Sequence, residues 1–385
     1  MIFTDLRFIV LFVLCWGSFF LVPRRWRAAV LAFFGTVFYA IYAGRALLIV
    51  IVLVALVFVS GVRAFLAWLA GVAVVGVLAY YKLAYVVPAL PGAAGDSTSL
   101  IVPLGLSYLS FELLHVTIER HRGRIRDLAW TDLLAFAFFA PARAAGPIKR
   151  FPHFIDEVRN AELSAANVYS GFLRVLLGLT KKFLLADILA LTVRESNYAA
   201  SMHHAWIIVL AYSLQIYFDF SAYSDIAIGL SRMMGIRLPE NFRNPYLSPN
   251  IRDFWNRWHI TLSQWVRDYV FTPTGRTLMR TRLRPWPFVI AAISYLIAFA
   301  VVGAWHGLTA GFLIWGLYHG LLLTLYHGLR LKIPPVITDH PWYGSRVARA
   351  LAIAVTFFLV TVGWVPFMLP LPDAKKMLVL MFGLG

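Results

Sequence analysis

The sequence contains one cysteine, Cys15, among its 385 residues. A single thiol excludes an intramolecular disulfide, a cysteine-based zinc cluster and a paired-thiol redox motif. Because Cys15 lies inside an apolar run, we interpret it as a small apolar packing residue.

Several local catalytic motifs are also missing. The sequence has no Gly-rich phosphate loop, which argues against coupling to ATP, and no Gly-x-Ser-x-Gly nucleophile elbow of the α/β-hydrolases. It has no His-Glu-x-x-His motif, and its ten histidines form no close set with carboxylates. We therefore predict no metal site and no bound cofactor.

Hydrophobic residues, in contrast, make up 61% of the chain, and the mean hydropathy is +0.74. Apolar residues of a globular protein only approach half of the total, so this chain must lie in lipid. We predict an all-α polytopic membrane protein with about eleven transmembrane helices, allowing for short packed ones. The expected spans are 6–22, 28–43, 46–60, 64–80, 100–118, 130–145, 172–191, 205–230, 287–304, 308–329 and 347–369. We expect them to form a single membrane domain over residues 1–385.

The first apolar run meets Pro23 and a basic cluster where a small-residue cleavage site would be needed, so we expect a retained helix and no cleaved signal peptide. A net charge of +17 could suggest a nucleic-acid partner, but the basic residues are scattered between apolar runs. Membrane topology explains them better. The basic segments are 24–27, 120–126, 143–150 and 276–284. By the positive-inside rule the first and the last face the cytoplasm, which gives an exported N-terminus.

Strict alternation of the expected spans would place segment 276–284 outside, so at least one earlier element is expected to be re-entrant. Residues 232–285 are the candidate region, because prolines disrupt helix interiors there. We predict short re-entrant or interfacial helices. One predicted helical face carries Trp258, Leu262, Trp265 and Tyr269, and another carries Arg257, Thr261, Gln264 and Asp268. The alternative is a helix lying in the interface with aromatic anchors.

His306 lies between apolar segments, and Gly303, Gly307 and Gly311 leave room for a substrate or for a closely packed helix. An ionisable residue at membrane depth is costly and persists mainly where it lines a cavity or does chemistry. A neutral imidazole could take a proton from a hydroxyl. We predict His306 as a catalytic base; the alternative is a histidine that hydrogen-bonds across a helix interface.

His259, within Phe254-Trp-Asn-Arg-Trp-His-Ile, is the second catalytic candidate, although alone it could be a structural interfacial histidine. With His306 as the base, His259 could orient the acyl carbonyl or donate to the developing oxyanion.

The acidic residues in apolar segments are expected to be structural. Asp219 and Asp225 are separated by about 600° on an ideal helix, so they form no carboxylate dyad, and we expect them to pair with nearby arginines. Glu112 and His115 share a helical face, and we expect a paired packing role for them.

Four tracts resemble the membrane-bound O-acyltransferase (MBOAT) family. They are Phe218-Asp-Phe-Ser-Ala-Tyr-Ser-Asp-Ile-Ala-Ile-Gly, Leu238-Pro-Glu-Asn-Phe-Arg-Asn-Pro-Tyr, Phe254-Trp-Asn-Arg-Trp-His-Ile-Thr-Leu-Ser-Gln-Trp-Val-Arg-Asp-Tyr and Trp305-His-Gly. The similarity extends upstream through Val102-Pro-Leu-Gly-Leu-Ser-Tyr and Ala145-Gly-Pro-Ile-Lys-Arg. It is strongest to the bacterial branch that contains alginate O-acetyltransferases and teichoic acid D-alanyltransferases.

This resemblance implies a ring of helices around a thin central region, with a tunnel in which a cytoplasmic thioester meets an acceptor from the outer side. His306 matches the essential histidine of the family, and His259 matches a second catalytic position. The resemblance further implies tunnel or supporting roles, which fall on Asn256, Trp305, Gly307, Trp255, Trp258, Asp219 and His319. The segment Phe271-Thr-Pro-Thr-Gly-Arg departs from the Leu-Gly-Gly turn of many bacterial members.

The function implied is transfer of a short acyl group, acetyl, to a hydroxyl of an exported cell-surface polysaccharide. The donor would be acetyl-CoA or an acyl carrier protein. The enzyme would lie in the bacterial cytoplasmic (inner) membrane. It would transfer the acyl group directly or through an extracytoplasmic acyltransferase partner. D-alanyl transfer to teichoic acid is the nearest alternative. A proton-coupled transporter is the alternative of another class, although the sequence lacks an evident inverted pair of broken helices. It would use Asp219, Asp225, Glu112 and His306.

Overall fold

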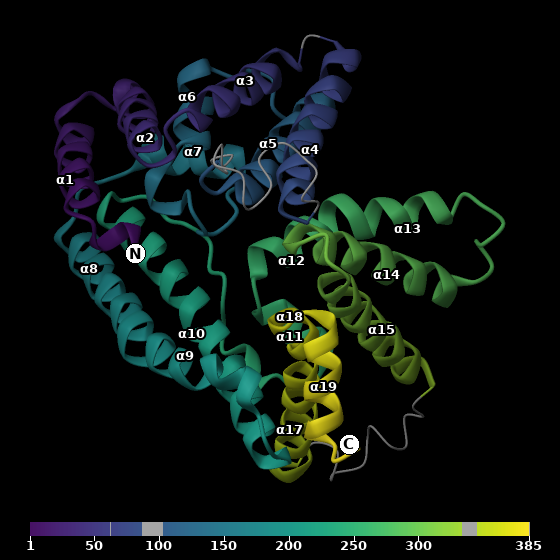
Figure 1. Ribbon diagram of the computed structural model, residues 1–385. Coiled ribbons are helices and arrows are strands. Elements are labelled where there is room, and N and C mark those ends of the chain that lie inside the picture. The colour runs from purple at the N-terminus through teal and green to yellow at the C-terminus, as the bar shows by residue number, and fades with distance from the viewer. Residues whose placement is uncertain (62, 87–102, 333–344, 385) are drawn as a thin grey trace. The chain divides into compact units, whose positions relative to one another are not determined.

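The computed structural model describes residues 1–61, 63–86, 103–332 and 345–384. Within these ranges the chain is helical and contains no β-strand, which confirms the predicted all-α class (Figure 1). Six described helical segments are long and apolar enough to cross a membrane, and three more are apolar but shorter. The protein is therefore a multi-pass membrane protein, but the predicted number of eleven spans is not confirmed. The six long segments are Arg24–Ala43, Ala64–Ala84, Met202–Met233, Pro287–His306, Ala310–Lys332 and Arg346–Met368.

The described residues group into two compact units. Unit 1 contains residues 1–179 and 222–239, and unit 2 contains residues 180–221 and 240–385. The single domain expected over residues 1–385 stays a prediction. The helices of unit 1 are α1 (Leu6–Leu21), α2 (Arg27–Ala43), α3 (Ala46–Val59), α4 (Ala64–Val86), α5 (Leu106–His121), α6 (Trp130–Ala137), α7 (Phe151–Asn160) and α8 (Ala165–Thr180), with the end of α10 (Met202–Met233).

Unit 1 is held together by a large apolar core and by close helix packing at glycines. A Cβ atom added at Gly171 of α8 would lie 2.6 Å from the carbonyl oxygen of Gly229 of α10. Such close approach lets backbones pack where lipid offers no hydrophobic driving force between helices. Arg174 of α8 also bonds Asp225 of α10 at 2.9 Å, which confirms the predicted pairing of Asp225 with an arginine.

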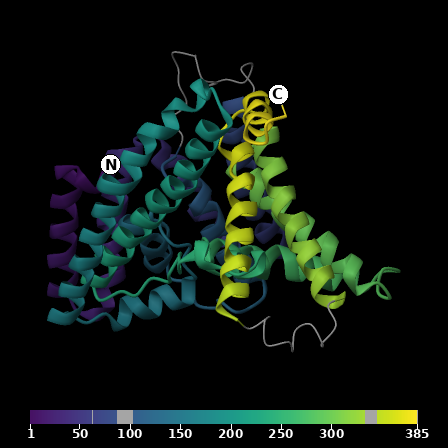
Figure 2. The same ribbon diagram turned by 90° about the horizontal axis from the view of Figure 1, so that it is seen from below.

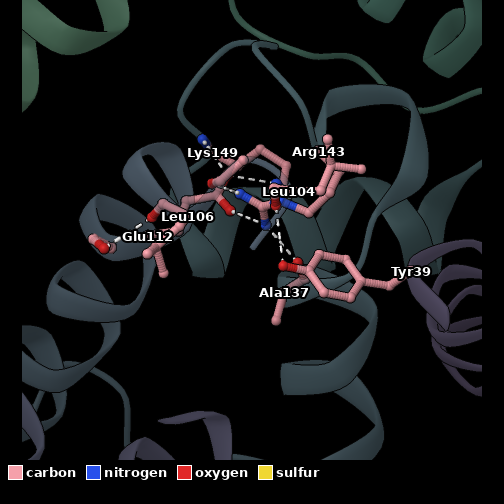
Figure 3. Close-up of polar contacts among 9 residues, drawn as sticks. Tyr39, Leu104, Leu106, Glu112, Ala137, Arg143 and Lys149 are labelled. Carbon is pink, nitrogen blue, oxygen red and sulfur yellow. Dashed lines mark hydrogen bonds and ion pairs between the residues drawn. The ribbon is translucent and has the colours of Figure 1, made fainter. Parts of the chain in front are cut away.

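A buried ion cluster fixes the middle of unit 1 (Figure 3). The carboxylate of Glu112 accepts from Arg143 at 3.2 Å and from the ammonium group of Lys149, and all three side chains are buried. Arg143 also donates to the carbonyl of Ala137 at 2.5 Å. His115, on the same face of α5 as Glu112, accepts a bond from the Phe151 amide at 3.0 Å. The predicted structural role of Glu112 and His115 is confirmed.

The same cluster corrects the interpretation of residues 143–150 as a basic loop. Arg143 and Lys149 are 0% and 1% exposed, because each bonds Glu112. Buried charges are tolerated where they are paired and hydrogen-bonded. These two cations therefore stabilise the fold and do not form a basic surface.

Unit 2 contains the other α-helices of the described residues. They are the start of α10, α9 (Asp187–Val193), α11 (Ile251–Arg257), α12 (Ile260–Val266), α13 (Thr272–Leu278), α14 (Pro287–His306), α15 (Ala310–Lys332), α17 (Arg346–Gly363), α18 (Val365–Met368) and α19 (Leu371–Met381). Helices α14 and α15 run side by side in both views (Figures 1 and 2). Glycines again allow the contact, since a Cβ atom at Gly316 would lie 2.3 Å from the carbonyl oxygen of Phe299.

The central region has the short helices that its prolines predict. The expected continuous helical face from Trp258 to Tyr269 is wrong, however, because α11 ends at Arg257 and α12 begins at Ile260. Trp258 lies in the break, so it does not share a helix with Trp265. A π-helical turn, Arg267–Phe271, then carries the chain into α13. The break places His259 at a turn, and this positions the candidate site.

Candidate active site

His259 occupies the turn between α11 and α12 in a left-handed conformation, with φ 41° and ψ 55°. Such a backbone is unusual for a residue with a side chain, and it costs of the order of 1–3 kcal/mol unless the surroundings impose it. Residues held in this way cluster at functional sites. The turn directs His259 away from the regular path of either helix.

Backbone and side-chain bonds from an extended segment impose this turn. The amide of Ile260 donates to the carbonyl of Asn241 at 2.9 Å, and the amide of Arg243 donates to the carbonyl of Arg257 at 3.0 Å. The buried side chain of Asn241 accepts from the hydroxyl of Thr261 at 2.7 Å. The tract around Asn241 therefore clamps the turn on both sides of His259.

The imidazole of His259 is 1% exposed and packs against aromatic rings. Its centroid lies 4.6 Å from the ring of Phe220 and 6.2 Å from that of Trp305. Burial lowers the pKa of His259 well below its usual value, and the neighbouring His306 lowers it further. The ring is consequently neutral at physiological pH, with one nitrogen able to donate and the other able to accept.

His306 is the last residue of α14, and its ring is partly exposed. The ring centroid lies 4.6 Å from that of Trp305, 5.2 Å from Trp315 and 5.0 Å from Phe367. Trp305 thus contacts both histidines, which come from segments 47 residues apart in the chain (306 − 259). The structure brings together the two residues that the sequence selected as catalytic.

Three of the predicted supporting residues, Trp255, Trp258 and His319, belong to an aromatic wall beside His306. His319 of α15 is fully buried, with its ring centroid 5.2 Å from those of Trp255 and Trp315. Trp258 lies 5.1 Å from Trp364, the residue between α17 and α18, in the same wall. Within the described part of the chain no hydrogen-bond partner reaches the ring nitrogens of His319. Its position, separated from His306 by Trp315, fits a supporting residue.

A cavity of about 280 Å³ opens beside this wall, between α11, α12 and the α14–α15 pair. The lining combines an apolar side, which includes Trp255 and Phe299, with polar side chains, which include Asn256. Arg252 and Arg267 also line it. Arg252 forms no ion pair with the described residues, so it offers a positive charge at the cavity.

Asp219 has a structural partner. Its carboxylate bonds Lys182 at 2.6 Å, and Lys182 also bonds Asp187 at 2.9 Å. The partner is a lysine where we expected an arginine. The Asp219 side chain is half exposed. Its supporting role at the site stays a prediction.

The glycines near His306 serve close packing. A Cβ atom at Gly303 would lie 2.5 Å from the carbonyl oxygen of Phe312, and one at Gly307 would lie 2.4 Å from Cδ2 of the Phe312 ring. Of the two interpretations of these glycines, the structure supports packing against α15. Across the described residues, no three His, Cys, Asp or Glu side chains gather as a metal site would require.

Comparison with known proteins decides the family. The model of the MBOAT, membrane-bound O-acyltransferase family, matches residues 58–361. The chain belongs to this family. Curated relatives include a protein named probable alginate O-acetylase AlgI from Pseudomonas aeruginosa, 35% identical over 296 residues, or 75% of this chain and 53% of the relative.

Two further MBOAT relatives carry other names. The teichoic acid D-alanyltransferase of Bacillus subtilis is 34% identical over 278 residues, or 70% of this chain and 69% of the relative. The peptidoglycan O-acetyltransferase of Helicobacter pylori is 34% identical over 323 residues, or 75% of this chain and 58% of the relative. The chain therefore spans about half the length of the alginate relative and somewhat more of the other two.

Some residues of the site were missed by sequence reasoning. Asn241 was quoted only as part of a tract, although a buried asparagine in an apolar chain is itself a signal for a specific hydrogen-bonded role. Arg252 was not predicted as a binding residue, because one arginine among several in residues 232–285 carries no distinguishing signal. Phe220, Phe312 and Phe367 had no signal, because aromatic residues are common in apolar helices.

Proposed function

We propose that this protein transfers an acetyl group from a cytoplasmic thioester to a hydroxyl of an exported cell-surface polysaccharide. The observation that carries the proposal is the pairing of a buried, neutral His259 with a partly exposed His306 around Trp305. Acyl transfer needs a base for the hydroxyl proton and a group for the carbonyl oxygen.

His306 acts as the base, since its ring is the accessible one. The hydroxyl oxygen of the acceptor attacks the thioester carbonyl carbon while His306 takes the hydroxyl proton. A C–O bond forms, and collapse of the tetrahedral intermediate breaks the C–S bond. The departing thiolate receives the proton back from His306. The products are an ester and a free thiol, with no oxidant or nucleotide consumed.

His259 supports the same step from a fixed position. A neutral imidazole can donate one N–H to the carbonyl oxygen as negative charge develops there. The Asn241 clamp holds the turn of His259 in place before substrate arrives. Such preorganisation is worth most in a buried site, where the donor needs no reorientation during the reaction.

The 280 Å³ cavity is the proposed donor site. Its apolar side suits the arm that carries the thioester, while Arg252 and Arg267 suit the phosphate of coenzyme A or of a carrier-protein arm. Arg267 already bonds Asp268 at 3.1 Å, which leaves Arg252 as the more available cation. We place the enzyme in the bacterial inner membrane, with transfer to the polysaccharide direct or through an extracytoplasmic acyltransferase partner.

A thiol-release assay on purified full-length protein tests the proposal. With acetyl-CoA and alginate oligosaccharide, the wild type is expected to release thiol and form ester. The rate of thiol release should be about 10²–10⁴-fold lower in His306→Ala. His327→Ala is the matched control, because His327 lies in α15 against Phe288 and outside the site. Equal rates in the wild type and His306→Ala would refute the proposal. A D-alanyl thioester, tested in parallel, distinguishes the function named in the Bacillus relative.

A further inference from the structure

Two phenylalanines border the accessible side of His306. The ring of Phe367 lies 5.0 Å from the imidazole centroid at 75°, and the ring of Phe312 lies 6.2 Å away and nearly parallel, at 23°. Both rings are partly exposed, as His306 is, whereas Trp305 and Trp315 are buried. Of these four rings around His306, Phe312 and Phe367 are therefore the ones that a substrate can reach.

The two rings also support each other, with centroids 4.9 Å apart in an edge-to-face contact. Such pairs contribute about 0.5–1.5 kcal/mol beyond the area that they bury. They come from separate elements, since Phe312 lies in the first turn of α15 and Phe367 lies in the four-residue helix α18. Together they form one aromatic surface beside the imidazole.

The backbone holds this surface in place at two glycines. The Phe312 ring rests on Gly307, where an added Cβ atom would meet ring carbon Cδ2 at 2.4 Å. Helix α15 meets α18 at Gly311, where an added Cβ atom would lie 2.4 Å from the carbonyl oxygen of Pro366, the residue before Phe367. The Phe312 ring therefore cannot move toward Gly307, and the close contact at Gly311 fixes the backbone beside Phe367.

We infer that Phe312 and Phe367 set the maximum length of the acyl group that this enzyme transfers. The inference rests on the proposed function and names its selectivity. The attacked carbonyl carbon is one hydroxyl oxygen away from His306, so the acyl chain begins within about 3–3.5 Å of that oxygen. Rings centred 5.0 Å and 6.2 Å from the imidazole then occupy the space into which a longer chain would extend.

The physical reason for selectivity is overpacking. An acetyl group adds one methyl beyond the carbonyl carbon, whereas a butyryl group adds two further methylenes that must displace a ring. One extra methylene in a tight pocket changes kcat/KM by about 10–200-fold. The wild type should accordingly prefer acetyl over butyryl donors, and removing either ring should relax the preference.

The test compares acetyl-, propionyl- and butyryl-CoA with purified full-length protein and alginate oligosaccharide as the hydroxyl acceptor. The measured quantity is the ratio of kcat/KM for butyryl to that for acetyl. Phe367→Ala and Phe312→Ala are each expected to raise this ratio at least about 10-fold. Phe288→Ala is the matched control, because Phe288 lies in the same helix as His306 but contacts His327; its ratio should equal that of the wild type.

Leucine variants cover the case in which an alanine variant fails to fold, since Phe312→Leu and Phe367→Leu keep most of the packing volume and should raise the ratio less. An unchanged ratio in active, folded variants would overturn the inference, as would a wild type that prefers butyryl-CoA. Failure of the proposed function has a different signature, because it appears as equal rates for the wild type and His306→Ala with every donor.

Discussion

The rings of His259 and Trp305 meet edge to face, with centroids 6.2 Å apart and an interplanar angle of 66°. Trp305 also contacts the neighbouring His306 at 4.6 Å. A single indole therefore fixes both imidazoles, one at a turn after α11 and the other at the end of α14. Catalytic groups must be held within about 0.5 Å of their productive geometry by packed neighbours.

Trp305→Ala should lower kcat about 10²-fold, because a shift of 1 Å in a catalytic group costs of that order. Trp305→Phe keeps an aromatic ring against both histidines and should retain more of the rate. The comparison of kcat for the two variants, at equal amounts of folded protein by thermal melting, checks this. A fully active alanine variant would show that Trp305 does not position the histidines.

The two histidines could be selected from the sequence, since ionisable residues in apolar tracts are rare and stand out. The turn that positions His259 could not be predicted. His259 adopts a left-handed backbone at a position with no Gly or Asn-Gly signal, so the break between α11 and α12 was mistaken for a continuous helix. The helix-breaking bonds come from Asn241, 18 residues upstream, and local periodicity carries no trace of them.

The ion pairs and the aromatic wall were also predictable only in part. The sequence predicted that Asp225 and Glu112 would be paired, because an isolated charge in lipid is too costly. It did not predict that Glu112 would draw both Arg143 and Lys149 into the core. Phe312 and Phe367 acquire their significance only through the approach of α15 and α18, which no short-range pattern specifies.

The pH dependence of activity should not involve His259. Burial, with a smaller contribution from His306, lowers its pKa well below the usual value, so the ring is neutral throughout the physiological range and gains a proton only in stronger acid. His259→Asn keeps a hydrogen-bond donor and should lower kcat less than His259→Ala. The acid limb of the rate profile of His259→Asn should coincide with that of the wild type. A displaced limb would assign proton transfer to His259.

Gly307→Ala should destabilise the protein by about 1–3 kcal/mol, the usual cost of overpacking. The added Cβ atom would lie 2.4 Å from ring carbon Cδ2 of Phe312, and that ring must move. Gly71→Ala is the matched control, since nothing lies within 4 Å of a Cβ atom there. The melting temperature should fall in Gly307→Ala and recover partly in the double variant Gly307→Ala, Phe312→Leu. It should not fall in Gly71→Ala. No recovery in the double variant would show that the clash lies elsewhere.

Lys149 should make the stability of the protein rise with pH in the alkaline range. Burial lowers the pKa of its ammonium group from the usual 10.5 to about 8, although Glu112 partly offsets the effect. Between these two values the unfolded chain binds the proton and the folded chain does not, so the free energy of unfolding increases with pH by at most about 1.4 kcal/mol per pH unit. Below pH 8 both states are protonated, and the contribution is constant.

Melting of the wild type and of Lys149→Arg at pH 8 and pH 10 isolates this group, because arginine stays charged in both states and gives no such slope. The melting temperature of the wild type, minus that of the variant, should increase from pH 8 to pH 10. A constant difference would mean that Lys149 keeps its proton in the fold, held by Glu112 more strongly than burial opposes it.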